Sequence, residues 1–131
     1  MQERNQELVD KYYARGIAAS EKGELELAIE DYTEAITLDP KFAQAYYQRG
    51  LAHAKNGELD KAVEDYTTAI ELKSDYADAY YNRGGAFLRL GKRERAEADL
   101  TTARNMGVDA ITALDKILKD YDRAWKVLGN S

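Results

Sequence analysis

The sequence lacks most of the residues on which enzyme and metal sites are built. It has no cysteine and a single histidine, His53, among 131 residues. The absence of thiols excludes disulfides, thiolate zinc sites and cysteine nucleophiles, and one histidine leaves no nucleophile–base pair. One proline and nine glycines are too few for a flexible linker protein. We therefore expect neither an enzyme nor a bound cofactor or metal.

Long apolar segments are missing as well. No run approaches the roughly 18 apolar residues of a membrane span, and the first residues lack the apolar segment of a secretory signal. The net charge of −5 argues against nucleic-acid binding, which usually needs a basic surface. With 44% hydrophobic and 33% charged residues, the composition is that of a folded globular domain. A cytoplasmic setting is expected, with no membrane and no nucleic acid as partners.

An internal repeat dominates what is present. The motif Tyr-Tyr-x-Arg-Gly occurs at residues 12–16, 46–50 and 80–84, so each copy follows the previous one after 34 residues. Residues 9–42 and 43–76 are identical at sixteen of 34 aligned positions. This period predicts a tandem repeat array. One domain, residues 1–131, is expected to hold repeats 9–42, 43–76 and 77–110.

Each repeat is predicted to form two helices, because its apolar residues are spaced by three and four. Gly23 stands where a left-handed residue would end the first helix. Asp39 followed by Pro40 is typical of a helix start, with Asp39 as the cap. Gly50 and its counterparts are expected to let paired helices approach closely. The predicted helices lie near 7–21, 24–38, 41–55, 58–72, 75–89 and 92–106, with a seventh at 110–128.

The segment after residue 109 does not continue the repeat. Its apolar residues are spaced as one stripe of a helix. A capping helix that covers the last repeat is the main interpretation, and a helix that binds a partner or a second copy is the alternative. The stripe consists of Ile111, Leu114, Leu118, Tyr121, Trp125 and Leu128.

The repeat resembles the tetratricopeptide repeat (TPR) family. The shared pattern is an aromatic residue at repeat position four, glycine at eight, alanine at twenty, an aromatic at 24 and alanine at 27. The resemblance implies an all-α, right-handed superhelical array of antiparallel helix hairpins, an α-solenoid. It further implies that the first helices line a concave groove for a peptide of a partner protein. The implied groove residues are Asp10, Tyr13, Ile17, Gln44, Tyr47, Gln48, Leu51, Lys55, Asp78, Tyr81, Asn82 and Arg89.

Position nine of the repeat departs from the family pattern. The family favours asparagine there, whereas this chain has Ile17, Leu51 and Gly85. We expect an apolar groove floor in the first two repeats and a ligand with apolar side chains. The alternative is that Ile17 and Leu51 only pack on a neighbouring helix.

The resemblance also argues against one known activity of the family. Co-chaperones that hold the C-terminal carboxylates of heat-shock chaperones use lysine, arginine and asparagine side chains. The matching positions here carry no cation and one acid, so we do not expect that ligand. They are Tyr13, Ile17, Gln48, Asp78 and Asn82.

The remaining polar residues are expected to be structural. His53 occupies a packing position of the repeat, and pairs such as Glu64-Asp65 recur on second helices, as solvated faces do. The sequence thus predicts a non-enzymatic, monomeric adaptor that binds a partner protein or peptide. One alternative is a scaffold that self-assembles through its open N-terminal end, its groove or its C-terminal helix. Another is an engineered or excised repeat array without a ligand.

Overall fold

The computed structural model describes residues 2–107, 119–120 and 122–123, and within them the fold is all-α. The expected seventh helix, near 110–128, falls outside the described residues except at those last four positions. None of the described helices could cross a membrane. The helices are α1 (Gln2–Glu21), α2 (Leu25–Leu38), α3 (Ala43–Lys55), α4 (Leu59–Leu72), α5 (Ala77–Arg89) and α6 (Arg93–Asn105).

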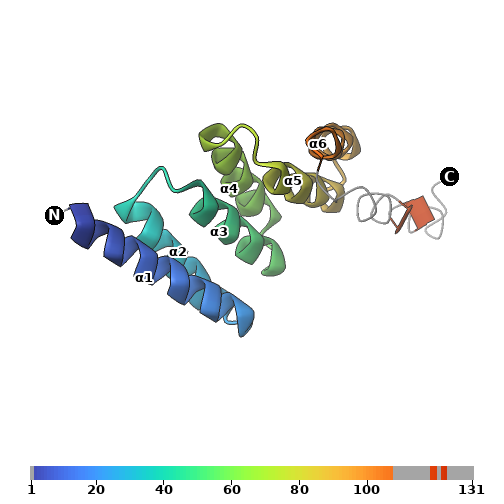
Figure 1. Cartoon of the computed structure of the whole chain (residues 1–131). Coiled ribbons are helices and arrows are strands. Elements are labelled where there is room, and N and C mark those ends of the chain that lie inside the picture. The colour runs from blue at the N-terminus through green and yellow to red at the C-terminus, as the bar shows by residue number, and fades with distance from the viewer. Residues whose placement is uncertain (1, 108–118, 121, 124–131) are drawn as a thin grey trace.

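The six helices form three antiparallel hairpins stacked in chain order, α1/α2, α3/α4 and α5/α6 (Figure 1). The second helix of one hairpin packs on the first helix of the next, so α2 contacts α3 and α4 contacts α5. The first helices α1, α3 and α5 also meet one another in order. The result is the predicted right-handed α-solenoid, in which the first helices share one face.

The turns inside the hairpins have the predicted geometry. Gly23, Gly57 and Gly91 adopt φ values of +77°, +80° and +78°, the left-handed region that favours glycine. At the first turn the N–H of Glu24 donates to the carbonyl of Ala19 at 2.9 Å. This bond supplies a partner to a carbonyl that would otherwise have none at the end of the helix.

Close helix approach depends on glycine at repeat position eight. A Cβ added to Gly50 would lie 2.7 Å from Cε1 of Tyr66 and 3.3 Å from the carbonyl oxygen of Ala62. Tyr66 and Ala62 are both buried on α4. The large ring therefore fills the space that the missing side chain leaves, and the two helices approach closely at Gly50, as the sequence predicted.

The expected cap at Asp39 and Pro40 is wrong. α3 begins at Ala43, after Phe42, and Phe42 makes no side-chain capping bond. Asp39 accepts a bond from the N–H of Lys41 at 3.2 Å, within the turn. The ring of Phe42 lies 4.8 Å from that of Tyr13, so aromatic packing between hairpins fixes where this helix starts.

The expectation that the acidic pairs of the second helices are solvated holds for Glu64, which is exposed, but is wrong for its neighbour Asp65. Asp65 is 6% exposed and accepts two bonds from Arg49, at 2.8 and 2.7 Å. These bonds raise the pKa of Arg49. Arg49 also donates to Oγ1 of Thr33 in the preceding hairpin at 3.2 Å. We call this three-residue contact the arginine tie.

The arginine tie recurs once in full and once in part. Arg83 binds Asp99 at 2.7 and 2.8 Å and Thr67 at 3.2 Å. In the first hairpin Arg15 is 53% exposed and its Nη2 lies 3.8 Å from Asp31. The second oxygen of Asp31 is buried without a hydrogen-bond partner in the described structure. The first tie is thus incomplete.

His53 is buried, as expected for a packing position. Its Nδ1 lies 3.2 Å from Oε1 of Glu58, which also accepts bonds from Asn56 and Lys61. The Asn56 bond, followed by those of Lys61 and His53, lowers the pKa of Glu58 to about 2. This local network closes the second hairpin turn.

Candidate peptide-binding groove

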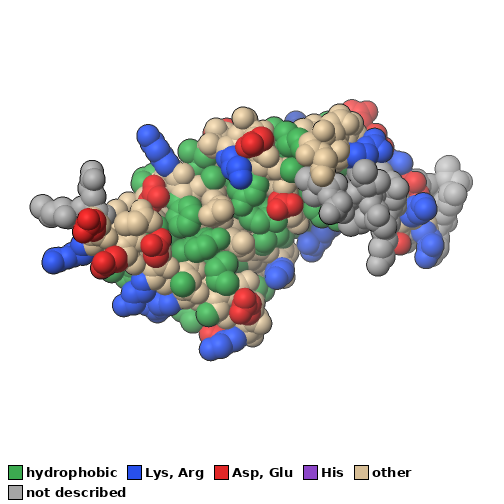
Figure 2. All heavy atoms as spheres, in the orientation of Figure 1, with side chains coloured by type: hydrophobic (Ala, Val, Ile, Leu, Met, Phe, Trp, Pro, Cys, Tyr) green, Lys and Arg blue, Asp and Glu red, His purple; other side chains and the backbone are tan. Residues whose placement is uncertain are grey.

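The first helices present an apolar face. Figure 2 shows hydrophobic side chains gathered over α3 and its borders with the neighbouring helices, with many charged side chains toward the N-terminal end of α1. Apolar area exposed along adjacent helices is a feature of binding surfaces on repeat proteins. The face is therefore the natural place to look for a site.

A cavity of about 520 Å³ opens on this face between α3 and α5. Its apolar wall includes Leu51 and Ala54 from α3, and Ala86 and Leu88 from α5, with Tyr66 of α4 behind them. Leu51 is half-buried and packs against the core cluster of Tyr66 and Ala86 while it lines the cavity. It thus has both of the roles that the sequence left open.

Gly85 provides much of the room. It lines the cavity, and a Cβ added there would meet no atom within 4 Å. Repeat position nine carries Ile17 and Leu51 in the two preceding hairpins. The missing side chain leaves open space where the other repeats have an aliphatic group. The break at position nine was the signal for this site in the sequence.

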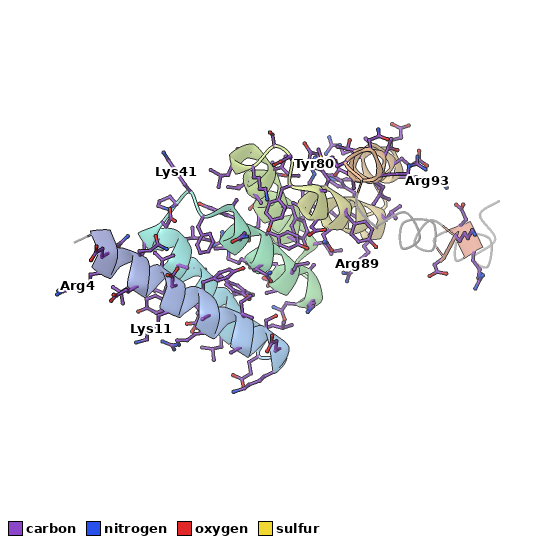
Figure 3. All side chains as sticks on the ribbon, in the orientation of Figure 1. Arg4, Lys11, Lys41, Tyr80, Arg89 and Arg93 are labelled. Carbon is purple, nitrogen blue, oxygen red and sulfur yellow. The ribbon has the colours of Figure 1, made fainter. Side chains whose placement is uncertain are left out.

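Two cations stand at the mouth of the cavity. Lys55 ends α3 and Arg89 ends α5, and both line the cavity and are exposed. Figure 3 shows Arg89 on the side of α5 opposite α6. Its Nη1 donates to the carbonyl of Ala54 at 3.4 Å. In the described part of the chain, neither cation has a carboxylate within 4.0 Å.

Asn82 and Asp120 complete the polar lining. The Nδ2 of Asn82 donates to the hydroxyl of Tyr47 and to the carbonyl of Asp78, both at 2.9 Å. This amide is therefore held in place before any ligand arrives. Asp120 comes from the C-terminal segment and is the one acid among the lining residues that the structure describes.

The tyrosines at repeat position five are partly structural. The ring of Tyr47 lies 5.0 Å from Tyr76 and 6.0 Å from Tyr66. Burial, with a smaller contribution from Asp78, raises the pKa of Tyr47 to about 12, so its hydroxyl stays protonated. Tyr13 packs in the same way against Phe42, and Tyr81 against the core cluster of the third hairpin.

The structure brings only some of the expected groove residues together. Four of the twelve, Leu51, Lys55, Asn82 and Arg89, line the cavity. Tyr47 joins them through Asn82. The other seven lie along the same helices without lining it. They are Asp10, Tyr13, Ile17, Gln44, Gln48, Asp78 and Tyr81.

The sequence predicted a deep apolar groove floor in the first and second repeats, whereas the cavity lies between the second and third. Tyr66, a buried ring of α4 that was not among the expected groove residues, also lines the cavity. For Ile17 the sequence left groove floor and helix packing open, and the residue packs against the core cluster of Tyr32. Asp120 was not among the expected groove residues. Among the described residues no three acidic or histidine side chains are placed to hold a metal ion.

Stacked helix hairpins with glycine at the close contacts define a helical-repeat protein. The family model described as TPR repeat matches residues 10–57 and 55–91. The chain therefore belongs to the tetratricopeptide repeat family. A sequence comparison with curated proteins finds no match.

Solved structures share the architecture. The chain is 33% identical to MamA with a TM-score of 0.74, covering 76% of this chain and 58% of MamA. It thus spans little more than half of that relative. The second TPR domain of human RPAP3, solved with the HSP70 peptide SGPTIEEVD, is 33% identical with a TM-score of 0.80, covering 86% and 97%. The Arabidopsis OM64 TPR domain is 27% identical, with a TM-score of 0.83, covering 89% and 98%.

Proposed function

We propose that this chain is a non-enzymatic adaptor that binds a peptide segment of a partner protein on the face of α1, α3 and α5. The observation that carries the proposal is the cavity of about 520 Å³ between α3 and α5, within the roughly 300–1,000 Å³ of ligand sites. Residues 1–131 would act as one domain of three repeats. The cytoplasmic setting stays a prediction, which cell fractionation tests.

The solved relatives support peptide binding as the general activity. RPAP3 was solved with an HSP70 peptide and Spaghetti with the HSP90 peptide SRMEEVD, the latter at 32% identity. This chain has Ile17 and Asp78 among the positions matched to the chaperone-binding cations and amides. We therefore propose a peptide ligand other than a chaperone C-terminus.

Leu51→Arg tests the groove. Leu51 lines the cavity, and an arginine there would place a charge where an apolar ligand side chain docks. Burying an unpaired charge costs several kcal/mol, enough to lower affinity about a hundredfold or more. The fold should survive because a long side chain on an open face can reach water. The measurement is capture of partners from native lysate, followed by affinity with the purified prey.

Glu64→Arg is the matched control, because Glu64 is exposed on α4, outside the cavity lining. It should bind like the original chain. A folded, monomeric Leu51→Arg protein that keeps full affinity would show that the partner binds elsewhere. An unfolded variant would show that Leu51 serves mainly the core.

Self-association is a second candidate function, favoured by the incomplete arginine tie of the first hairpin. Arg15 is half-exposed, and a buried oxygen of Asp31 has no partner in the described structure. A second copy offering a threonine helix, as α2 and α4 do, would complete it. Light scattering over a range of concentrations, with Arg15→Glu for comparison, separates a monomeric adaptor from a scaffold.

A further inference from the structure

We infer that the cavity between α3 and α5 selects a leucine-like side chain flanked by an acidic residue in the partner segment. The inference rests on the proposed peptide-binding function and specifies its ligand. It depends on two independent features of the cavity, the apolar depth at Gly85 and the two cations at the mouth.

The preference for an apolar ligand side chain follows from the apolar residues that line the cavity. Gly85 has no side chain, so the cavity beside it stays open. The apolar residues around this space are Leu51, Ala86, Leu88 and Tyr66. A branched aliphatic group removes most apolar area from water there without needing a hydrogen-bond partner. A buried polar side chain would lose its bonds to water, and the apolar wall would offer none in return.

The preference for an acidic residue beside the docked side chain follows from the two cations at the mouth of the cavity. Lys55 and Arg89 lie at the C-terminal ends of α3 and α5, and no described carboxylate lies within 4.0 Å of either. Among the described lining residues Asp120 is the single opposing charge, so these residues contribute two cations against one acid. A carboxylate beside the docked side chain would bind both cations through charge-assisted hydrogen bonds. It would compete with Asp120 for that place.

A negative charge at the opposite end of the groove favours one orientation of the bound segment. Asp78 is exposed near the start of α5, eleven residues before Arg89, a rise of about 16 Å along the helix. An acidic flank is therefore attracted at one end and repelled at the other. This arrangement fixes the orientation of a bound segment more than it adds affinity.

The test uses three short probes and two-dimensional NMR of the full chain. The probes are acetyl-Glu-Leu-Glu-amide, its neutral analogue acetyl-Gln-Leu-Gln-amide, and acetyl-Glu-Ala-Glu-amide. The first should shift the amide signals of residues 51, 85, 88 and 89 at millimolar concentration. It should bind about fivefold more tightly than the neutral analogue and about tenfold more tightly than the alanine analogue.

Two variants assign the effects to their sources. Gly85→Leu fills the cavity with the side chain that Leu51 carries one repeat earlier, and it should abolish the shifts while the helix content is kept. Arg89→Gln should remove the preference for glutamate over glutamine but leave leucine over alanine. Asp120→Asn should tighten only the acidic probes.

Several results would overturn the inference. Equal binding of the acidic and neutral probes, shifts outside the cavity, or no shifts at all would each do so. Binding seen only in Asp120→Asn would make the chain's own C-terminal segment the occupant. Cavity signals that move with protein concentration alone would make it a second copy. If the inference fails while Leu51→Arg still loses its partner, the proposed function stands with another ligand.

Discussion

Two adjacent glycines in α5 have opposite surroundings. A Cβ on Gly84 would lie 2.7 Å from Cδ2 of Leu100 and 3.3 Å from the carbonyl oxygen of Ala96, whereas one on Gly85 would meet nothing within 4 Å. Leu100 is 1% exposed and has little space to move. Gly84 therefore serves helix packing, and Gly85 serves the open cavity.

We expect Gly84→Ala and Gly85→Ala to change stability in opposite directions. Gly84→Ala should lower the free energy of unfolding by about 1–3 kcal/mol through overpacking. Gly85→Ala should raise it by up to about 1 kcal/mol, because alanine is the better helix former and no clash opposes it. Urea unfolding followed by circular dichroism measures both. Equal effects of the two substitutions would show that the hairpin can widen freely at Gly84.

Between elements, the arginine tie joins three helices. Arg49 of α3 holds the buried Asp65 of α4 and reaches Thr33 of α2 in the hairpin before. Two parallel bonds from one guanidinium to a carboxylate fix the relative rotation of the helices. The contact between hairpins is therefore directional as well as apolar.

Arg49→Ala should cost far more than Arg15→Ala. Removal of Arg49 leaves Asp65 buried without its cation, which costs about 3–5 kcal/mol. Arg15 is 53% exposed and 3.8 Å from its acid, so its loss should cost less than about 1 kcal/mol. Thermal and urea unfolding of the two variants give the comparison. Similar losses would mean that the long, exposed contact in the first hairpin is as strong as the two short ones.

Sequence patterns predicted the helices because helix formation follows local rules. The spacing of apolar residues and the position of Gly23 placed the ends of the six helices within two residues of their observed places, except the start of α1, which was expected near residue 7 and lies at Gln2. The start of α3 was wrong because the ring contact of Phe42 with Tyr13 comes from another hairpin. Tyr13 and Phe42 are far apart in the sequence, so local sequence patterns do not reveal their contact.

The candidate site was harder to predict for the same reason. The family pattern identified the face and four lining residues, but not the cavity, which needs Gly85 of α5 beside Leu51 of α3 and Tyr66 of α4. Recurring acids were taken as solvated because charge usually faces water. Asp65 differs only because Arg49 lies across from it.

At the scale of the whole molecule, we predict that the C-terminal segment caps the array of hairpins. The apolar stripe of residues 111–128 should cover the last hairpin, each large side chain being worth up to about 1.5–3 kcal/mol. Truncation after Gly107 would then remove as much as the total stability of such a domain, roughly 5–15 kcal/mol. The shortened chain should melt much earlier or aggregate.

Removal of residues 129–131 alone is the control for this truncation, since these residues follow the stripe. It should leave the melting temperature unchanged in a thermal scan. A long truncation that melts like the intact chain would favour a free helix that binds a partner.

The arginine tie has a consequence for how such an array can grow. Each joint pairs a threonine on the second helix of one unit with an arginine on the first helix of the next, 16 positions later, as in Thr33 with Arg49 and Thr67 with Arg83. Thr101 stands in the same register on α6 and is exposed. A gene duplication that copies any 34-residue segment in frame would insert a unit whose two faces already match their new neighbours. The fold can therefore lengthen by whole units without a new interface having to evolve.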